Sequence, residues 1–276
     1  LQRRGVAVPA PLWSAAALLS TPGVVADIHW DYVAAGADIL VADTFRTNSR
    51  TLERAGVGSE GQHLCRLGVE LARQATACQS REPERAILVA ASVAPVEDCY
   101  RPELVPSGTE LRAEHDQMAA WLATAAPDLL WIETIGTVRE ARAAAEAAAR
   151  HGLPFAISFV VQENGDLLGG EPLATAVAAI EPSQPLAIGL NCIPPRGLTD
   201  LLPRLRRITN RPIAAYAHVS NAPPIRGWTY SQGMNPEEYA CAARQWLSAG
   251  AVVIGGCCGT TPEHIRAAGQ LLATLQ

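Results

Sequence analysis

The sequence predicts an α/β fold built on a parallel sheet and, within that class, a (β/α)8 TIM barrel. Short apolar runs of strand length alternate with longer alanine-rich stretches of helical character along the whole chain. Within each short run the apolar residues are nearly continuous, which is typical of strands buried on both faces. Strict alternation of strands and helices over about 250 residues favours the barrel.

Seven segments have this strand character. A helical stretch that begins near Pro11 precedes the first of them, and another helical stretch follows each one. The predicted strands span residues 38–44, 87–93, 128–134, 154–161, 186–191, 213–218 and 251–256.

The helices between these strands carry start and stop signals. Pro236 occupies a first helical position, and Thr261 with Pro262 can open the last helix. Gly152 and Gly250 lie where the preceding helices should end. Three capping boxes are predicted, at SGTE (107–110), TVRE (137–140) and NPEE (235–238).

Seven strands are one fewer than a closed barrel contains. Since the chain opens directly into a helix, we expect the eighth strand to precede residue 1. A doubly wound open sheet is the alternative arrangement of the same elements. No linker, low-complexity tract or repeat interrupts the pattern, so residues 1–276 are predicted to form a single domain.

The composition argues against nucleic-acid and membrane partners. Hydrophobic residues make up 49% of 276, enough for one large core, and the net charge of −5 comes without a lysine or arginine cluster. The longest apolar runs, such as residues 86–93, are strand-sized, and the start LQRRGVAVPAPLW lacks the apolar stretch of a signal peptide. The odd count of seven cysteines fits a reducing cytoplasm better than a disulfide framework.

Three cysteines fall at the carboxyl ends of predicted strands. Cys192 follows GLN, and the adjacent pair Cys257 and Cys258 follows two glycines and precedes a helix start. In a barrel these ends form the mouth, where active sites lie. Three thiolates with one open position are the ligand set of a catalytic zinc site, and soft thiolates favour zinc over magnesium or calcium. Burial as small apolar residues, or a disulfide between the adjacent pair, are the alternatives.

Several segments resemble the homocysteine S-methyltransferase family, which includes betaine–homocysteine and S-methylmethionine–homocysteine methyltransferases. The double-cysteine motif is the most specific of them, and the resemblance covers nearly the whole chain and implies a (β/α)8 barrel. The segments, in order, are PLWSA (11–15), HWDYVAAGADIL (29–40), DTFRTN (43–48), ASVAP (91–95), WIETI (131–135), GLNC (189–192) and GGCCGTTPEHI (255–265).

The resemblance implies a zinc site and a substrate site. Cys192, Cys257 and Cys258 correspond to the family's zinc ligands, and the substrate thiol takes the fourth position. Coordination to zinc would deprotonate that thiol and so provide the nucleophile. Glu133 matches a glutamate that binds the amino group of homocysteine; a surface or capping glutamate is the alternative.

Two further residues are candidates for substrate binding. Thr44 resembles a family threonine near the substrate, although a hydroxyl at a strand end can also cap its own backbone. Asn191 precedes the first cysteine and either holds that loop or touches the substrate. Asp43 is a weaker candidate, because the family often has another polar residue there.

The sequence departs from the family pattern in two places. The family's Asp-Gly-Gly-like segment, which binds the substrate amino acid, would lie before residue 1. In AYAHVSNAP (215–223), His218 and Asn221 stand where the family more often has a Tyr-Pro-Asn or Tyr-Ala-Asn run. His218 is read first as a hydrogen-bonded strand-end histidine. Trp228 and Tyr230 can either pack a loop or form a cation–π contact with a cationic donor.

The remaining candidates are set aside. Cys65, Cys78 and Cys241 lie in predicted helices and are read as core or surface thiols, and Cys99 lies in a loop. His29 lacks the glycine that a cobalamin-binding Asp-x-His-x-x-Gly pattern requires, so no cobalamin site is expected.

The predicted function is zinc-dependent methyl transfer from a donor to the thiol of L-homocysteine, giving methionine. The donor is S-methylmethionine, S-adenosylmethionine or betaine, with a weak preference for a sulfonium. The expected partners are these small molecules, and a homo-oligomer is left open. The alternatives are a zinc- and thiol-binding protein without turnover and a methyltransferase for another small thiol. A zinc hydrolase is disfavoured, because such enzymes use histidine and carboxylate ligands.

Overall fold

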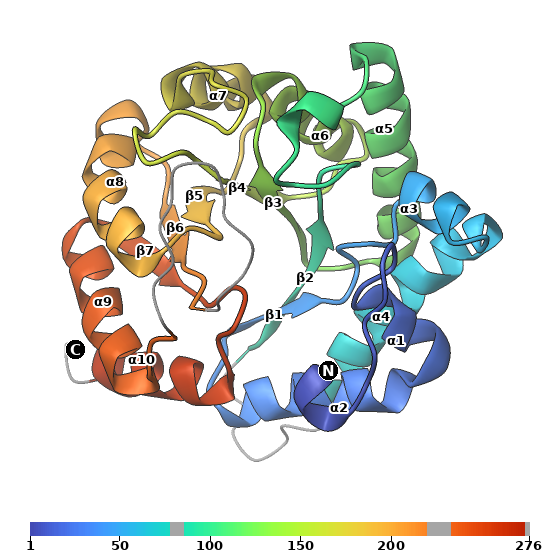
Figure 1. Ribbon diagram of the computed structural model, residues 1–276, viewed down its shortest axis with the longest axis horizontal. Coiled ribbons are helices and arrows are strands. Elements are labelled where there is room, and N and C mark those ends of the chain that lie inside the picture. Colours follow the sequence, from blue (N-terminus) through green and yellow to red (C-terminus); the bar gives the residue numbers. More distant parts are fainter. Residues whose placement is uncertain (78–85, 220–232, 274–276) are drawn as a thin grey trace.

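The computed structural model describes residues 1–77, 86–219 and 233–273, and its centre is a single curled sheet. Seven strands run parallel in the order β1-β2-β3-β4-β5-β6-β7, so each strand pairs with its neighbours in sequence. Figure 1 shows the strands curling around a centre, with the helices outside them. The strands are β1 (Ile39–Ala42), β2 (Leu88–Val93), β3 (Leu129–Ile135), β4 (Phe155–Phe159), β5 (Ala187–Asn191), β6 (Ile213–Tyr216) and β7 (Ala251–Ile254).

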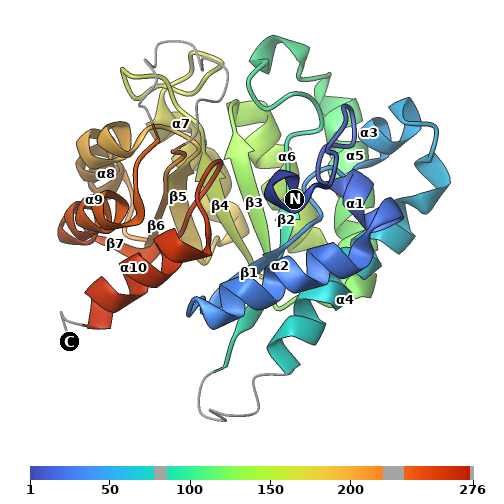
Figure 2. The ribbon, with the colours of Figure 1, turned by 60° about the horizontal axis from the view of Figure 1, so that its bottom comes forward.

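The helices form the outer layer of the molecule, as the turned view in Figure 2 also shows. Short 3-10 helices, labelled η1–η4, supplement them in the connections. The α-helices are α1 (Ala15–Ser20), α2 (Pro22–Ala34), α3 (Ser49–Arg54), α4 (Gly61–Ala77), α5 (Gly108–Ala125), α6 (Val138–Arg150), α7 (Leu173–Ile180), α8 (Pro195–Ile208), α9 (Pro236–Ser248) and α10 (Pro262–Ala273). The 3-10 helices are η1 (Gln2–Arg4), η2 (Gly58–Glu60), η3 (Pro102–Leu104) and η4 (Glu181–Ser183).

The continuous apolar runs are explained by two cores on opposite faces of the sheet. The larger core lies between the strands and the helices, and the smaller one lies inside the curl. Because side chains alternate between the faces of a strand, every second residue faces the inside. The inner core uses small residues at most positions: Ala90, Leu129, Trp131, Ala156, Ala187, Ala214 and Tyr216.

The predicted elements are found, with one difference at a helix start. All seven strands lie inside the predicted ranges to within one residue, and Gly152 and Gly250 have left-handed backbones after α6 and α9. The capping boxes at 107–110 and 235–238 are complete. At 137–140 the Thr137 side chain caps the helix, but the Glu140 carboxylate turns away to accept from the backbone N–H of Val96 at 2.9 Å.

The expected closed barrel is matched only in part. The sheet is a curled half-barrel of seven strands, and in the part of the chain that the structure describes, β1 and β7 are its two edges and do not pair with each other. Each edge strand carries an exposed valine, Val41 at 42% and Val252 at 66% exposure. The closing eighth strand of the prediction is not among the described residues.

Among the described helices, none combines the length and apolar character needed to span a bilayer.

Candidate metal centre

The three cysteines that follow strand ends come together as one cluster, here called the sulfur cluster. Their Sγ atoms all lie within 4.8 Å of one another. The separations are 3.0 Å between Cys257 and Cys192, 3.9 Å between Cys192 and Cys258, and 4.0 Å within the adjacent pair. Of the described cysteines none is in a disulfide, so the alternative of a bond within the pair is not what the structure shows.

The backbone around Cys192 is held from several sides. Cys192 has a left-handed backbone with φ of 56°, a conformation that side chains other than glycine rarely adopt. Its N–H donates to the carbonyl of Tyr216 at 3.2 Å. Its carbonyl accepts from Nδ1 of His218 at 2.9 Å. These bonds fix the sharp turn that points the sulfur towards the cluster.

The other two cysteines are tied to the strand beside them. The N–H of Cys257 donates to the carbonyl of Ala217 at 3.0 Å, and the carbonyl of Cys258 accepts from the N–H of Val219 at 2.8 Å. The loop after β7 therefore pairs with the residues that follow β6. This pairing brings the adjacent cysteines to the end of β6. Cys192 lies on the other side of β6, where β5 ends.

The cluster is arranged to hold one negative charge before any metal binds. Hydrogen bonds from Cys192 and Cys257 lower the pKa of the Cys258 thiol to about 3. The pKa of Cys257 is raised by its hydrogen bonds to Cys192 and Cys258 and by burial. For Cys192 the hydrogen bond from Cys257 lowers the pKa, but the bond to Cys258 and burial outweigh it and the net shift is upward. One thiolate is thus stabilised by two thiols.

The donor set fits a tetrahedral thiolate-binding metal. With metal–sulfur bonds of about 2.3 Å, tetrahedral geometry places the sulfurs ~3.8 Å apart. The separations of 3.9 and 4.0 Å agree with that spacing, and the pair at 3.0 Å has to open by about 0.8 Å. The group contains no fourth histidine, cysteine or carboxylate among the described residues.

A second group of side chains, here called the carboxylate network, is centred on Glu133 in β3. One carboxylate oxygen accepts from the Ser92 hydroxyl at 2.5 Å and the other from the Tyr216 hydroxyl at 3.3 Å. Trp131 Nε1 donates to the Tyr216 oxygen at 2.7 Å, and the Ser158 hydroxyl also bonds to it. These residues come from β2, β3, β4 and β6 and line the inside of the curl.

The protonation of Glu133 is strongly perturbed. Burial raises the pKa of Glu133 to about 7, although the hydrogen bonds from Ser92 and Tyr216 act in the opposite direction. The negative charge of Cys258 raises it further, so the two groups are within electrostatic reach. A half-buried carboxylate beside a thiolate is a natural receptor for a cationic group.

A bulge in β3 sets the direction of the Glu133 side chain. The pairing of β3 with β4 shifts between Ile132 and Ile135, which marks a bulge, and Thr134 has a left-handed φ of 62°. Bulges of this kind redirect a side chain and are common next to active sites. The Asn191 amide holds the bulge: its oxygen accepts from the Thr134 N–H at 3.1 Å and its nitrogen donates to the Thr134 hydroxyl at 2.8 Å.

The other predicted substrate residues are placed as follows. Asn191 is fully buried, and its amide is bonded to Thr134 in β3. Thr44 is also fully buried, and its hydroxyl donates to the carbonyl of Ser92 at 2.8 Å. Asp43 accepts from the Ser14 hydroxyl at 2.6 Å. None of these contacts tests binding of a substrate, so the predictions stand as predictions.

The residues set aside earlier behave as expected where the structure describes them. Cys65 is a buried thiol of α4, Cys241 is exposed on α9, and Cys99 lies in a turn. His29 is buried in α2, where desolvation lowers its pKa to about 4. Four residues that were singled out lie outside the described residues: Cys78, Asn221, Trp228 and Tyr230.

Sequence reasoning missed three side chains of these sites. Ser92 and Tyr216 point inward at the ends of β2 and β6, and the period-2 alternation of each strand carried that signal. Tyr100 places its hydroxyl 2.8 Å from the sulfur of Cys192. It lies in the long connection after β2, and nothing in its sequence spacing relates it to the cysteines.

In the comparisons with known proteins, this chain is similar to methyltransferases. The family model described as homocysteine S-methyltransferase matches residues 1–272. The homocysteine S-methyltransferase 2 of Zea mays is 31% identical, over 97% of this chain and 85% of its own. The selenocysteine Se-methyltransferase of Brassica oleracea var. italica is 30% identical, over 97% and 84%. The metallated form of the homocysteine methyltransferase MmuM from Escherichia coli superposes with a TM-score of 0.85 at 28% identity, over 98% of this chain and 91% of that one.

Proposed function

This chain belongs to the homocysteine S-methyltransferase family, and from that premise we propose that it transfers a methyl group to the thiol of L-homocysteine, giving methionine. The convergence of three cysteine sulfurs at the strand ends, with no fourth metal-binding side chain in the group among the described residues, is the observation that carries the proposal. The metallated form of a relative with a similar fold supports a bound metal.

We propose that the metal is zinc and that Cys192, Cys257 and Cys258 hold it. Thiolates are soft ligands, and tetrahedral sets of them select zinc among the common divalent cations. Bound zinc would supply Lewis acidity that keeps a coordinated substrate sulfur deprotonated at neutral pH. The already acidic Cys258 thiol provides the first thiolate for metal entry.

The protein's own groups would orient the amino acid. Glu133 as a carboxylate would bind the ammonium group, within electrostatic reach of the cysteines. Thr44 and Asn191 are proposed as neighbours of the substrate, and their hydrogen bonds to Ser92 and Thr134 support a role in shaping the site walls. Fixing both ends of the substrate turns methyl transfer into a reaction between positioned groups.

The methyl donor is proposed to be a cation: S-methylmethionine, S-adenosylmethionine or betaine. The substrate sulfur forms a new bond to the methyl carbon, and the bond from that carbon to the donor's positive sulfur or nitrogen breaks. The bonding electron pair stays with the donor, which leaves as a neutral molecule. His218 is buried beside Cys192, and its ring nitrogen Nδ1 donates to the carbonyl of that cysteine.

The finer features of the architecture are proposed as well. Residues 1–276 would act as one homocysteine-binding domain of (β/α)8 type, and the exposed valines of β1 and β7 support closure of the curl at these edges. The free thiols of the described cysteines favour a reducing cytoplasm. Light scattering would test whether the chain forms a homo-oligomer.

The deciding experiment is an acceptor-by-donor assay with zinc-loaded protein. Homocysteine, selenocysteine and cysteine are each incubated with each of the three donors, and methylated products are quantified by mass spectrometry. We expect methionine from homocysteine with one donor. A methylated product from selenocysteine or cysteine alone would show that this amino acid, and not homocysteine, is the methyl acceptor. No product from any pair, with zinc bound, would favour a binding protein without turnover.

A further inference from the structure

The connection between β2 and α5 brings a phenol to the sulfur cluster. The hydroxyl of Tyr100 lies 2.8 Å from Sγ of Cys192, and the ring is half-buried. A phenol, with an ordinary pKa of about 10, keeps its proton at neutral pH. A metal-bound Cys192 has no proton to give. In that state only the hydroxyl can donate.

The segment that carries Tyr100 has little regular structure of its own. Its one regular element is η3, which begins at Pro102, and the Tyr100 N–H donates to the exposed Asp98 carboxylate at 2.9 Å. A loop of this kind needs contacts from outside to hold a side chain within hydrogen-bond distance. Those contacts come three residues earlier, at Glu97.

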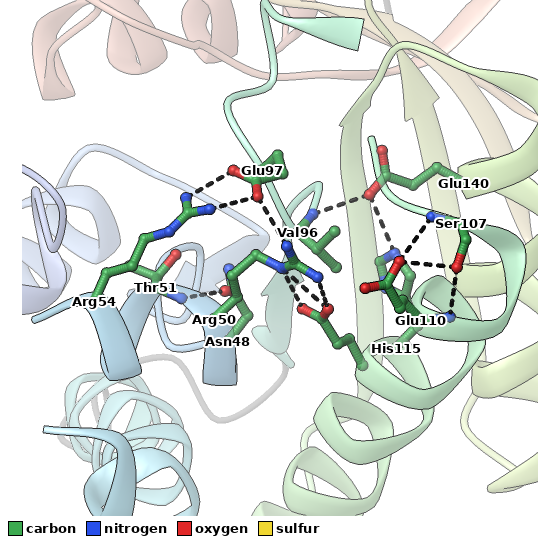
Figure 3. A network of polar contacts seen from close by, with 11 residues as sticks. Asn48, Arg50, Thr51, Arg54, Val96, Glu97, Ser107, Glu110, His115 and Glu140 are labelled. Carbon is green, nitrogen blue, oxygen red and sulfur yellow. Dashed lines mark hydrogen bonds and ion pairs between the residues drawn. The ribbon is translucent and has the colours of Figure 1, made fainter. Parts of the chain in front are cut away.

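Glu97 is the buried centre of a partly exposed ion-pair cluster, here called the guanidinium network (Figure 3). Its carboxylate, only 7% exposed, accepts from Arg54 at 2.7 and 2.6 Å and from Arg50 at 3.1 Å. Arg50 also donates to Glu114 of α5 at 3.0 and 3.1 Å. The backbone carbonyl of Glu97 accepts from Arg46 at 2.9 Å. Residues of α3, the loop and α5 are thereby joined.

The charges of the guanidinium network balance, and its central carboxylate, Glu97, belongs to the loop between β2 and α5. Two arginines, Arg50 and Arg54, face two carboxylates, Glu97 and Glu114. Burial alone would raise the pKa of Glu97, but the bonds and charges of Arg54 and Arg50 outweigh it and hold that pKa below its usual value. Removing Arg50 would leave the Glu114 carboxylate, only 15% exposed, without this partner, which is costly. These ion pairs are therefore suited to fixing the position of the loop that carries Glu97 and Tyr100.

We propose that Tyr100 is a hydrogen-bond donor to the metal-bound sulfur of Cys192, and that the ion pairs of Glu97 with Arg50 and Arg54 hold it there. Three thiolates around a divalent cation carry one excess negative charge, and a substrate thiolate adds a second. A donor to one ligand sulfur disperses that charge and so stabilises both states. Tyr100 touches a metal ligand; Glu97 is a positioning residue that acts through it. The inference rests on the proposed three-cysteine site but not on the methyl donor.

The test measures the metal site without any turnover. Zinc affinity is determined by competition with a chromophoric chelator, and Co²⁺-loaded protein is examined for its sulfur-to-cobalt charge-transfer bands. For Tyr100→Phe we expect about tenfold weaker zinc binding and charge-transfer bands at lower energy, because the sulfur becomes a stronger electron donor. For Glu97→Gln we expect changes in the same direction and of smaller size.

The double variant separates positioning from general destabilisation. If Glu97 acts through Tyr100, then Glu97→Gln adds nothing to the affinity or the spectrum of Tyr100→Phe. Arg150→Gln is the matched control, since it removes the ion pair of Arg150 with Asp116 between α6 and α5, and it should leave both readouts unchanged.

Three outcomes would overturn the inference. Unchanged zinc affinity and cobalt spectrum in Tyr100→Phe would remove the donor role, even if Glu97→Gln fails to fold. An equal effect of Glu97→Gln with and without the tyrosine hydroxyl would remove the positioning role. Wild-type protein that binds Co²⁺ without thiolate bands would overturn the three-cysteine site itself, a result distinct from the other two.

Discussion

The sulfur cluster and the carboxylate network lie at the same end of the sheet but are built from different parts of it. The three cysteines all belong to segments that follow a strand, and one of them needs a left-handed backbone to reach the others. Glu133 and its partners Ser92 and Tyr216 lie within strands: β2 pairs with β3, and Tyr216 of β6 reaches Glu133 across the inside of the curl.

The difference separates an adjustable site from a rigid one. The loop cysteines can move by the fraction of an ångström that metal binding requires, so their geometry depends on supports such as His218 and Tyr100. The carboxylate lies within a strand, at a bulge that the Asn191 amide holds, and its behaviour depends on the chemistry of the groups around it. Substitutions should therefore change metal retention at one site and ionic binding at the other.

The largest effect is expected at the cluster. Cys258→Ser removes the most acidic thiol, and we expect loss of bound metal and a fall in methyl transfer on the order of 10³-fold, since coordination contributes several kcal/mol. Metal content and product formation measure this. Cys241→Ser, at an exposed thiol of α9, is the matched control. Retention of a full equivalent of metal by Cys258→Ser would contradict the assignment.

Glu133→Gln should separate the two regions. It keeps the shape of the side chain but removes its charge, so we expect the KM for homocysteine to rise by about 10- to 100-fold, as for loss of a hydrogen bond between charged groups. Metal content should stay as in the wild type, because no cysteine contact is altered. Steady-state kinetics with metal analysis provides both numbers. Loss of metal would mean that the two regions are not independent.

Asn191 connects the two regions, because it precedes Cys192 and holds the bulge beside Glu133 through Thr134. Asn191→Ala leaves the buried Thr134 N–H without an acceptor, which should cost about 1–3 kcal/mol of unfolding free energy. We expect a lower melting temperature together with a roughly tenfold loss of kcat/KM, affecting metal affinity and KM alike. A change confined to one of them would show that the amide serves only that region.

The sequence predicted the strands and the cysteines well for a physical reason. Strands buried on both faces must be apolar throughout, and an adjacent cysteine pair at a strand end is a sequence motif that is easy to recognise. The sequence also placed Glu133 at the end of its strand. These features are local, and each is determined by a few adjacent residues.

The parts that the sequence did not reveal depend on contacts between distant segments. The bulge at Thr134 is held by Asn191, 57 residues later, and Tyr100 meets Cys192 across a separation of 92 residues. The carboxylate of Glu140 does not complete its capping box, because it accepts a hydrogen bond from the N–H of Val96 in another connection. The pairing of such partners depends on the folded sheet, and no spacing within one segment encodes it.

The smallest expected effect concerns the pH dependence of the carboxylate network. Because burial raises the pKa of Glu133 to about 7, the carboxylate that binds an ammonium is present above that pH and is lost below it. We therefore expect kcat/KM for homocysteine to fall as pH drops through 7, and Glu133→Gln to lack this limb. Ser92→Ala removes a hydrogen bond that lowers this pKa, so it should move the limb to higher pH.

The same profile distinguishes the carboxylate from the cluster. Protonation of metal-bound thiolates would also reduce activity at low pH, but it would release metal, whereas protonation of Glu133 would not. Metal content is therefore measured at each pH beside kcat/KM. A limb that persists in Glu133→Gln, or that Ser92→Ala leaves in place, would assign the titration to the loop cysteines and make the adjustable region, rather than the rigid one, the pH-sensitive part of the site.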